Sequence, residues 1–548
     1  MTPLSPSHRL RVALLEHPRE PSWEHLNDVA NAPLSASLLT PYLAAVLERA
    51  GHEVCVVEGH LGRLSPQECV RRVADARPDL LGIHVVYDWS DGAALRRLLG
   101  DLAEATGGAP AIVYGFYPTF AWSELLPTLP GVAAAVLGEP EATWAEAAAA
   151  LAGAARAEPA RALRGVPGLA VRLADGPARA TAPRALIDDL DALPFPRRSP
   201  ELFGLREVNV AGSRGCYGAC TFCTINSFYG PASRWRPRTP ENVAAEIEAV
   251  LAERPDKRRF YFVDPNFFGP GRSGRRRALA LARLLRERFS IRFGLEGRVN
   301  DIDEEVVGAL VEAGFDEILI GLESGSDQTL ARLNKRTTVE QNRRALRILR
   351  AHGIEPNVGF IMFEPGSRLE DVRTNLAFLE EEGLLSRLSV TVNVLYHQQI
   401  LLAGTPAYRA ARADGSLVPA AHNPYEGRVA FRHPEVAFLA ETMAEVSRHV
   451  LSSVPPEAWE REAVRPDPAL AALNRRLVAL FRDLLDGVDS GEVLPTPEVA
   501  RQVVDGIRAT LRTLPAAGPS DSSPPLCEST PVAADRLEKR VDSRRGPC

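Results

Sequence analysis

Three cysteines lie within eight residues of this chain, at Cys216, Cys220 and Cys223, in the pattern CxxxCxxC. The loop that carries them, residues 214–223, contains two glycines, and glycine lets a backbone curl until several side chains face one point. Thiolates at this density suit zinc or an iron–sulfur cluster. The sequence therefore predicts a metal centre on one tight loop.

The remaining cysteines argue against a disulfide framework. The chain has seven cysteines, an odd number, and the others are scattered at Cys55, Cys69, Cys527 and Cys548. A structural zinc site needs a fourth Cys or His at regular spacing, but the next histidine after the motif is His352. Three thiolates without a fourth ligand favour a cluster with one open iron. The scattered cysteines are interpreted as packing residues or free thiols.

An aromatic residue, Phe222, precedes the last cysteine, and with it the motif resembles that of the radical S-adenosylmethionine (SAM) enzymes. The resemblance implies a 4Fe–4S cluster on Cys216, Cys220 and Cys223, whose fourth iron is chelated by the amino and carboxylate groups of SAM. It also implies reductive cleavage of SAM to methionine and a 5′-deoxyadenosyl radical that abstracts hydrogen from carbon. Phe222 is expected to contact SAM.

Residues 10–155 alternate between short apolar runs and helical patterns. This alternation predicts an α/β domain with a doubly wound, Rossmann-like parallel sheet. Ligands of such sheets bind beyond the carboxyl ends of the strands, so the loops that follow the strands are the informative ones. The strands are expected at residues 10–15, 53–57, 80–86, 111–114 and 133–137.

Two glycine-centred segments, residues 115–119 and 138–141, are similar to the cobalamin-binding domain that precedes many radical SAM enzymes. The DxHxxG loop by which some of these domains ligate cobalt is missing, so a histidine ligand is not expected, and His60 and His84 are interpreted as surface or satisfied core residues. Some relatives keep the domain without the cofactor, and that alternative stays open. The resemblance implies cobalamin contacts at Ser37, Tyr87, Gly115, Phe116, Tyr117, Gly138 and Glu139.

Residues 205–400 again alternate between strands and helices. Six parallel strands with right-handed crossovers give a partial (β/α)6 barrel, whose site lies at the carboxyl ends of the strands. The cysteine loop directly follows the first strand, in agreement with the motif. The strands are expected at residues 207–211, 259–263, 291–295, 317–321, 356–362 and 389–395.

Polar residues at the ends of the barrel strands are the expected contacts of SAM. Asp264 occupies the place where the family meets the methionine amino group, and Arg298 offers a bidentate fork to the methionine carboxylate. Glu296 and Glu323 are expected at the ribose or the amino group. The full expected set is Phe222, Asp264, Glu296, Arg298, Glu323, Ser324 and Ile361.

Asn393, Tyr396 and His397 follow or end the sixth expected strand. They are candidate substrate contacts, with the alternative that they only close the barrel. No catalytic acid or base is assigned.

The chain is expected to divide into several domains. Helical spacing of apolar residues at 434–451 and 468–485 predicts a helical C-terminal region, and the Pro- and Ser-rich tail is expected to be disordered. The expected boundaries are 8–155 for the cobalamin domain, 156–204 for a proline-rich linker, 205–400 for the barrel, 401–512 for the helical region and 513–548 for the tail.

The charge of the chain limits its partners. Its 64 basic and 70 acidic residues give a formal charge of −6, which offers no electrostatic footprint for a nucleic acid. No apolar stretch approaches the ~20 residues that cross a bilayer. We therefore expect a cytoplasmic protein with a small-molecule or peptide substrate and a flavodoxin-like or other electron donor, without nucleic-acid or membrane partners. The oligomeric state stays open.

Together, the two resemblances imply a cobalamin-dependent radical SAM C-methyltransferase of specialised metabolism, such as antibiotic biosynthesis. One SAM molecule would methylate cob(I)alamin, and a second would be cleaved at the cluster. Two alternatives stay open: an enzyme with the same cofactors that cyclises, rearranges or dehydrates its substrate, and a non-catalytic cobalamin-binding or redox-sensing protein. No second three-cysteine cluster is present, which argues against a methylthiotransferase.

Overall fold

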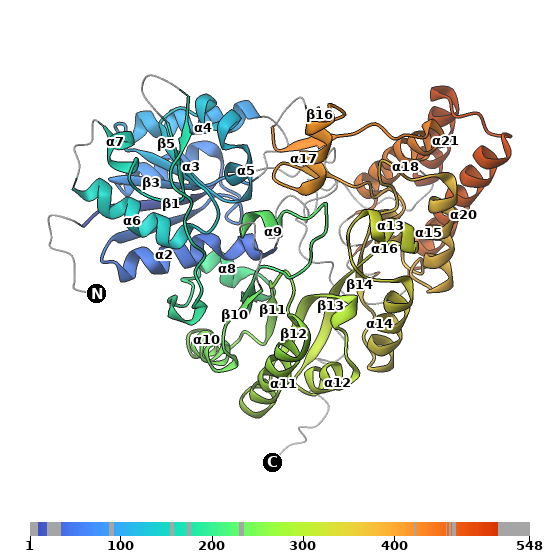
Figure 1. The fold of residues 1–548 in the computed structure, drawn as a ribbon, viewed down its shortest axis with the longest axis horizontal. Coiled ribbons are helices and arrows are strands. Elements are labelled where there is room, and N and C mark those ends of the chain that lie inside the picture. The colour runs from blue at the N-terminus through green and yellow to red at the C-terminus, as the bar shows by residue number, and fades with distance from the viewer. Residues whose placement is uncertain are drawn as a thin grey trace, which may run out of the picture.

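Two α/β units and a helical C-terminal region make up the fold (Figure 1). The computed structural model describes residues 9–18, 34–86, 92–153, 158–172, 177–229, 235–420, 424–455, 458–459, 462 and 467–512. Tyr87, an expected cobalamin contact, lies outside these residues, as do the C-terminal tail and its two cysteines.

The N-terminal sheet has the strand order β2–β1–β3–β4–β5–β6–β7. Helices α2 (Leu39–Arg49) and α6 (Pro140–Ala152) pack on one face, and α3 (Pro66–Asp75), α4 (Gly92–Ala105) and α5 (Phe116–Leu125) pack on the other. The predicted doubly wound sheet is thus confirmed. Its parallel strands are β1 (Arg11–Glu16), β2 (Glu53–Glu58), β3 (Leu80–His84), β4 (Ala111–Tyr114) and β5 (Val132–Val136).

The expected linker contributes to this sheet. Strand β6 (Leu169–Val171) pairs antiparallel with β5, and β7 (Arg179–Ala180) pairs with β6. Helix α7 (Pro159–Leu163) precedes them. Leu163, Leu169 and Val171 are buried in the N-terminal core, and this apolar burial explains why the segment does not remain a bare connection.

The second sheet has five parallel strands in the order β14–β13–β12–β11–β8. They are β8 (Val208–Val210), β11 (Arg259–Phe262), β12 (Arg292–Arg298), β13 (Phe315–Glu323) and β14 (Asn357–Phe360). The helices after them are α10 (Pro240–Glu253), α11 (Gly271–Arg288), α12 (Glu304–Glu312), α13 (Asp327–Arg332), α14 (Val339–Ala351) and α15 (Leu369–Glu381). Five of the six predicted barrel strands are confirmed.

The sixth prediction is wrong, because residues 388–394 form helix α16 (Leu388–Val394). The backbone amides of Leu388 and Ser389 donate to the carboxylate of Glu462 over 2.7 and 3.1 Å, and this distant side chain satisfies the start of the helix. The chain reaches the sixth position of the barrel only afterwards, where Phe363 and Gln398 form an isolated parallel bridge.

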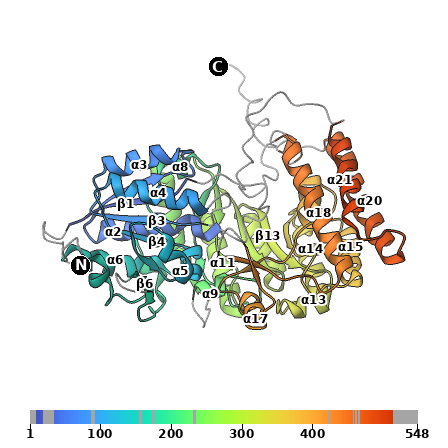
Figure 2. The same cartoon turned by 90° about the horizontal axis from the view of Figure 1, so that it is seen from above.

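The N-terminal unit and the C-terminal helices lie on opposite sides of the second sheet (Figure 2). The short helix η2 (Leu34–Leu38) brings Ser37 to β8, where its hydroxyl accepts a hydrogen bond from Asn209 over 2.9 Å. Leu38 and Tyr42 pack with Tyr261 inside the barrel. The open edge of the partial barrel is therefore closed by the preceding domain.

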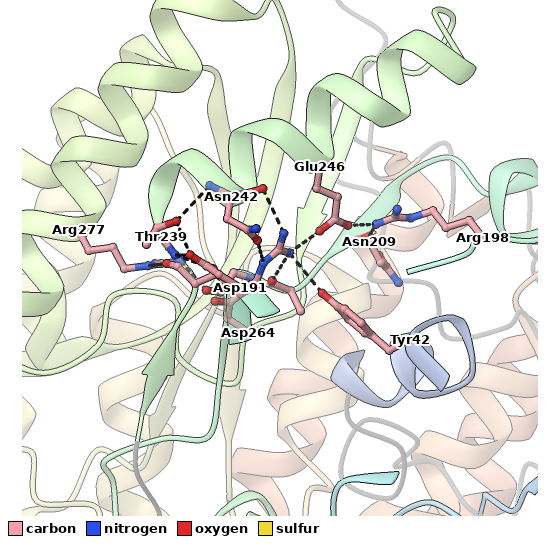
Figure 3. Close-up of polar contacts among 12 residues, drawn as sticks. Tyr42, Asp191, Arg198, Asn209, Thr239, Asn242, Glu246, Asp264 and Arg277 are labelled. Atoms are coloured by element: carbon pink, nitrogen blue, oxygen red, sulfur yellow. Dashed lines mark hydrogen bonds and ion pairs between the residues drawn. The ribbon is translucent and has the colours of Figure 1, made fainter. Parts of the chain in front are cut away.

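Buried ion pairs reinforce this contact (Figure 3). Arg198 of the connecting segment and Arg238 both bind the Glu246 carboxylate on α10. Arg238 also donates to the Tyr42 hydroxyl of α2 over 3.3 Å. Because the charged side chains are at most 5% exposed, the pairing satisfies charges that would otherwise be costly to bury.

The C-terminal region is helical, as predicted, with α18 (Pro434–Ser453), α20 (Pro468–Ser490) and α21 (Pro497–Leu511). It also contains a small sheet of β15 (Leu401–Leu402), β16 (Val418–Pro419) and β17 (Glu426–Arg428), with helix α17 (Pro406–Ala413). We call residues 401–420 and 424–428 the strap. Its Tyr408 and Tyr425 pack into the N-terminal core beside Tyr117. Within the described residues, no helix is both long and apolar enough to span a bilayer.

Candidate functional site

The cysteine loop rises from a short antiparallel ladder at its base. Strand β9 (Ser213–Arg214) pairs with β10 (Arg236–Pro237), and Arg214 lies opposite Arg236. Between these strands, Cys216 and Cys220 are buried and Cys223 is partly buried. Burial, together with the nearby Cys220 and Cys216 thiols, raises the pKa of Cys223 to about 12. The structure therefore brings the three predicted ligands together.

The three thiols suit a cluster by their chemistry. Among the described residues, no three His, Cys, Asp or Glu side chains are placed to hold a single metal ion. A 4Fe–4S cluster makes a different demand, since each soft thiolate binds a separate iron. Three cysteines on one loop supply three such ligands and leave one iron for another group.

Donor groups surround the sulfur atoms. Arg298 Nη1 donates to Cys220 Sγ over 3.4 Å, and the Gly218 amide donates to Cys216 Sγ over 3.3 Å. Lys335 Nζ lies 2.6 Å from Glu323 Oε1. Burial by itself would lower the pKa of Lys335, but Glu323 and Cys220 raise it above its usual value. Two buried cations thus offset the charge of the thiolates and of Glu323.

Lys335 is not among the site residues predicted from the sequence. The loop that carries it follows α13 and lies against the cysteine loop, since the Thr221 amide donates to the Leu333 carbonyl over 3.0 Å and Asn334 Nδ2 donates to the Ala219 carbonyl over 2.7 Å. Glu323, the ion-pair partner of Lys335, has a φ of 63°, in the left-handed region that is unfavourable for a glutamate. Strain of this kind clusters at functional sites, but the local sequence carries no signal of it.

Two buried acceptor atoms at the ends of β11 and β12 have no hydrogen-bond partner: Asn266 Oδ1 and Glu296 Oε1. Burial, with a smaller effect of the Asp264 carboxylate, raises the pKa of Glu296 to about 8. SAM carries an ammonium group, ribose hydroxyls and an adenine amine, all of which are donors. The unpartnered acceptors therefore fit this cofactor.

Two other expected SAM contacts are occupied by protein groups. Asp264 accepts hydrogen bonds from the Gly212 amide over 2.8 Å and from the Ser213 hydroxyl over 2.5 Å. Ser324 donates to Asn375 Oδ1 over 2.7 Å. Both residues are fully buried, and we interpret them as supports of the strand-end loops. Asn266 is the residue after β11 that keeps an unpaired acceptor.

The other expected SAM contacts lie near the cysteines or β14. Phe222 is partly buried on the cysteine loop. Ile361 follows β14, and its amide donates to the Glu323 carbonyl over 2.8 Å. These placements keep Phe222 and Ile361 as proposed contacts.

The structure separates the three expected substrate residues. His397 faces Glu323, and burial lowers its pKa to about 4. The Tyr396 ring lies next to that of His397, with 6.2 Å between the centroids. Asn393, in contrast, is exposed on α16 and donates to the Ser389 carbonyl over 2.7 Å. Only His397 and Tyr396 remain candidates.

The carboxyl edge of the N-terminal sheet combines bare backbone with buried polar groups. Gly115 and Gly138 have φ values of 118° and 88°, which only glycine adopts readily. The Ser35 hydroxyl is buried without a hydrogen-bond partner, which fits a polar ligand at this edge. His84 Nδ1 lies 2.9 Å from both carboxylate oxygens of Glu16, and this contact confirms its interpretation as a satisfied core histidine.

The residues expected to hold cobalamin also touch the rest of the protein. The Phe116 ring stacks on Phe228 of α9 (Ile225–Phe228), with 3.9 Å between the centroids. Tyr117 lies against Tyr425 of the strap at 5.4 Å, and Glu139 binds Arg214 over 3.0 Å. The two strand-end edges therefore meet directly at the cysteine loop.

Two family models match the two α/β units of the chain. One, described as the radical SAM superfamily, matches residues 210–379, and the other, described as the B12-binding domain, matches residues 37–148. The chain belongs to the radical SAM enzymes that carry a B12-binding domain. Its cofactors are accordingly a 4Fe–4S cluster, SAM and cobalamin.

Curated relatives of this radical SAM enzyme include proteins named as methyltransferases and as cyclases. It is 26% identical over 385 residues to "Uncharacterized methyltransferase PH0819" of Pyrococcus horikoshii, covering 68% of the chain and 78% of that protein. It is 30% identical over 316 residues to the anaerobic magnesium-protoporphyrin IX monomethyl ester cyclase of Synechocystis sp., covering 56% of the chain and 60% of the cyclase. These relatives support an enzyme rather than a non-catalytic binding protein.

Solved structures share the fold of the radical SAM enzyme. The cobalamin-dependent SAM radical enzyme OxsB with aqua-cobalamin superposes with a TM-score of 0.71 at 19% identity, over 92% of this chain and 80% of OxsB. The radical SAM methyltransferase TsrM of Kitasatospora setae, with cobalamin and a [4Fe–4S] cluster, gives 0.62 at 18% identity, over 91% of this chain and 99% of TsrM. At these identities the likeness shows the fold.

Proposed function

We propose that this radical SAM enzyme is a cobalamin-dependent methyltransferase that delivers a methyl group to a carbon of a small-molecule or peptide intermediate of specialised metabolism. The observation that carries this function is the direct contact between the cobalamin edge and the cysteine loop. Phe116 directly follows Gly115 at the end of β4, and its ring stacks on Phe228, five residues after Cys223. Methyl transfer between two cofactors requires such closeness.

The chain's own residues have distinct roles in this function. When bound, the cluster with SAM would supply a radical that abstracts a hydrogen atom from a carbon of the substrate, and cobalamin would supply a methyl group taken from SAM. Cys216, Cys220 and Cys223 hold the cluster. Asn266 and Glu296 accept hydrogen bonds from SAM and orient it.

The substrate is placed beside Glu323 and His397, near the sixth position of the barrel. Tyr425 and Phe228 are almost fully buried between the strap, the cysteine loop and the N-terminal sheet. These aromatic side chains exclude water from a reaction in which a radical must not be quenched. The strap thus completes the enclosure that the partial barrel leaves open.

The test supplies SAM with a deuterated methyl group to the anaerobically reconstituted and reduced enzyme. Extracts or compound pools of a cell that contains the substrate are added. A methyltransferase forms S-adenosylhomocysteine and 5′-deoxyadenosine together, with a product heavier by the labelled methyl group. Turnover to 5′-deoxyadenosine alone, with no labelled product and no S-adenosylhomocysteine, would exclude methyl transfer.

A second candidate is a cyclase with the same cofactors, favoured by the 30% identity to the magnesium-protoporphyrin cyclase. The same experiment distinguishes it, because a cyclase consumes SAM without moving the labelled methyl group. For either reaction, we propose a flavodoxin-like or other low-potential electron donor, since reductive cleavage of SAM needs an electron. We also propose a cytoplasmic location.

A further inference from the structure

We infer that Glu139 is a positioning residue that fixes the cysteine loop to the cobalamin domain, an inference that rests on the methyltransferase function proposed above. Glu139 follows Gly138 at the cobalamin edge, directly before helix α6. It was expected to contact cobalamin. Its contacts instead lead to the base of the cysteine loop.

Both oxygens of the Glu139 carboxylate are fully used by protein donors. Oε1 accepts from Arg214 Nη1 and from Arg236 Nη2, each over 3.0 Å. Oε2 accepts from Arg236 Nη1 over 3.0 Å and from the Ile187 amide over 3.1 Å. A carboxylate with four such donors is held in one orientation and has no strong acceptor position left for a ligand.

The two arginines are the residues that close the cysteine loop. Arg214 lies two residues before Cys216, and Arg236 lies directly opposite Arg214 in the β9–β10 ladder. Like charges that face each other across two strands repel one another. Glu139 accepts hydrogen bonds from both arginines. Its negative charge therefore offsets their mutual repulsion and attaches the base of the loop to the cobalamin domain.

Charge balance requires a second carboxylate, which Glu141 provides through its ion pair with Arg214. The exposed fractions of Glu139, Glu141, Arg214 and Arg236 are 7%, 1%, 6% and 4%. The four side chains form a buried group of two positive and two negative charges. Removing one carboxylate therefore leaves a buried positive charge without compensation.

Aromatic rings hold the same two arginines from the other side. The Arg214 guanidinium lies 5.0 Å from the centroid of the Tyr42 ring, and that of Arg236 lies 5.4 Å from the centroid of the Tyr229 ring. Tyr42 belongs to α2 of the N-terminal unit, whereas Tyr229 follows α9 just beyond the cysteines. The group thus joins the cobalamin edge to the β9–β10 ladder at the base of the cysteine loop and to the end of α9.

This arrangement sets the separation of the two cofactors. If Glu139 is neutralised, both cofactors still have their own binding residues, but the loop is no longer locked to the cobalamin edge. Radical formation at the cluster then proceeds while methyl transfer loses its geometry. The expected effect is uncoupling, with more 5′-deoxyadenosine formed for each methylated product.

The experiment compares full-length, anaerobically reconstituted enzyme with Glu139→Gln and with the matched control Glu146→Gln. Glu146 lies on the same helix, its side chain is 49% exposed, and it forms an ion pair with Arg184. Hydrogen exchange by mass spectrometry over residues 138–141 and 213–229 is measured with and without the cofactors. Iron, cobalt, 5′-deoxyadenosine and methylated product are quantified in parallel.

Glu139→Gln is expected to raise exchange in both segments by roughly tenfold while the core strands stay protected. Iron and cobalt contents remain near those of the wild type, and methylated product per 5′-deoxyadenosine falls about tenfold. Glu146→Gln leaves all of these values unchanged. Exchange in Glu139→Gln equal to that of the wild type overturns the inference.

If Glu139→Gln does not fold, Glu139→Asp retains the charge but shortens the reach, and it is expected to show the same local rise in exchange. If the wild type forms no methylated product, the proposed function fails, but the exchange comparison still decides whether Glu139 locks the loop. Unchanged exchange in Glu139→Asp as well as in the control would reject it.

Discussion

Arg298 Nη1 donates to Cys220 Sγ over 3.4 Å, although 78 residues separate the two in the sequence. The same guanidinium donates through Nε to Asn300 Oδ1 over 3.3 Å and through Nη2 to the Lys335 carbonyl. It also lies 5.5 Å from the centroid of the Tyr217 ring. Arg298 is therefore fixed beside the cluster ligands, and its contact with the SAM carboxylate stays a prediction.

Replacing Arg298 with Gln should make the cluster harder to reduce. A positive charge and an N–H donor near a thiolate stabilise the more negative, reduced cluster. We expect the midpoint potential to fall by roughly 60 mV, a tenfold change for a one-electron couple, in a redox titration followed by electron paramagnetic resonance. Arg275→Gln on α11, where the Arg275 side chain is 40% exposed, is the control. An unchanged potential in Arg298→Gln would contradict this role.

The buried carboxyl of Glu296 should make the cofactor-free protein less stable as the pH rises. Its pKa of about 8 lies above the ordinary value of 4.5, so the folded chain binds more protons than the unfolded chain between these values. The free energy of unfolding should fall through this window by up to about 1.4 kcal/mol per pH unit. Glu317, whose pKa is raised to about 7 by burial first of all, adds a smaller contribution.

Chemical denaturation of the wild type and of Glu296→Gln at several pH values isolates the effect of Glu296. The difference between the two curves removes the contribution of Glu317. The slope should be shallower in Glu296→Gln, because the amide does not titrate. Two parallel curves would show that Glu296 is already ionised in the folded protein at neutral pH.

The stacked pair of Phe116 and Phe228 should couple the two domains energetically. Each ring is at least 97% buried, and truncation of such a side chain to alanine costs about 3 kcal/mol. Because the rings touch, the double variant should lose roughly 1 kcal/mol less than the sum of the single variants. Equilibrium unfolding of the four proteins measures this coupling. Strict additivity would mean that the stack adds nothing beyond burial.

Glu462 should stabilise α16 from a distance of 73 and 74 residues along the chain. Its carboxylate accepts from the first amides of this helix, so Glu462→Ala should lower the free energy of unfolding by about 1–2 kcal/mol. Glu498→Ala, at an exposed position of α21, provides the comparison. A loss no larger than that of Glu498→Ala would rule out the capping role.

The contact of Glu462 with α16 also explains why the sixth barrel strand was predicted wrongly from the sequence. Residues 389–395 alternate valine with polar residues, a pattern that favours a strand. The structure forms a helix there because Leu388, Thr391, Val392 and Leu395 bury one face and Glu462 satisfies its start. No local pattern shows that cap. The other five barrel strands and all five parallel N-terminal strands were predictable, since each is a short run rich in apolar residues that is separated from the next by a helical pattern.

The site residues likewise divide into those that the sequence predicts and those that only the fold reveals. The cysteine motif was readable because its three ligands lie within eight residues. Lys335 could not be found, since only the fold places its loop on the cysteine loop. Glu139 was located at the correct edge, but its arginine partners could not be predicted, because they lie 75 and 97 residues away along the chain.

The central claim is that one chain holds cobalamin and the iron–sulfur cluster at two facing edges, each with its own residues. The most direct test is the iron and cobalt content of anaerobically reconstituted wild type and of the variant with Cys216, Cys220 and Cys223 replaced by alanine. The wild type should hold about four irons and about one cobalt per chain, and the variant should lose the iron and keep the cobalt. Wild-type protein without cobalt, or a variant that retains its iron, would contradict the claim.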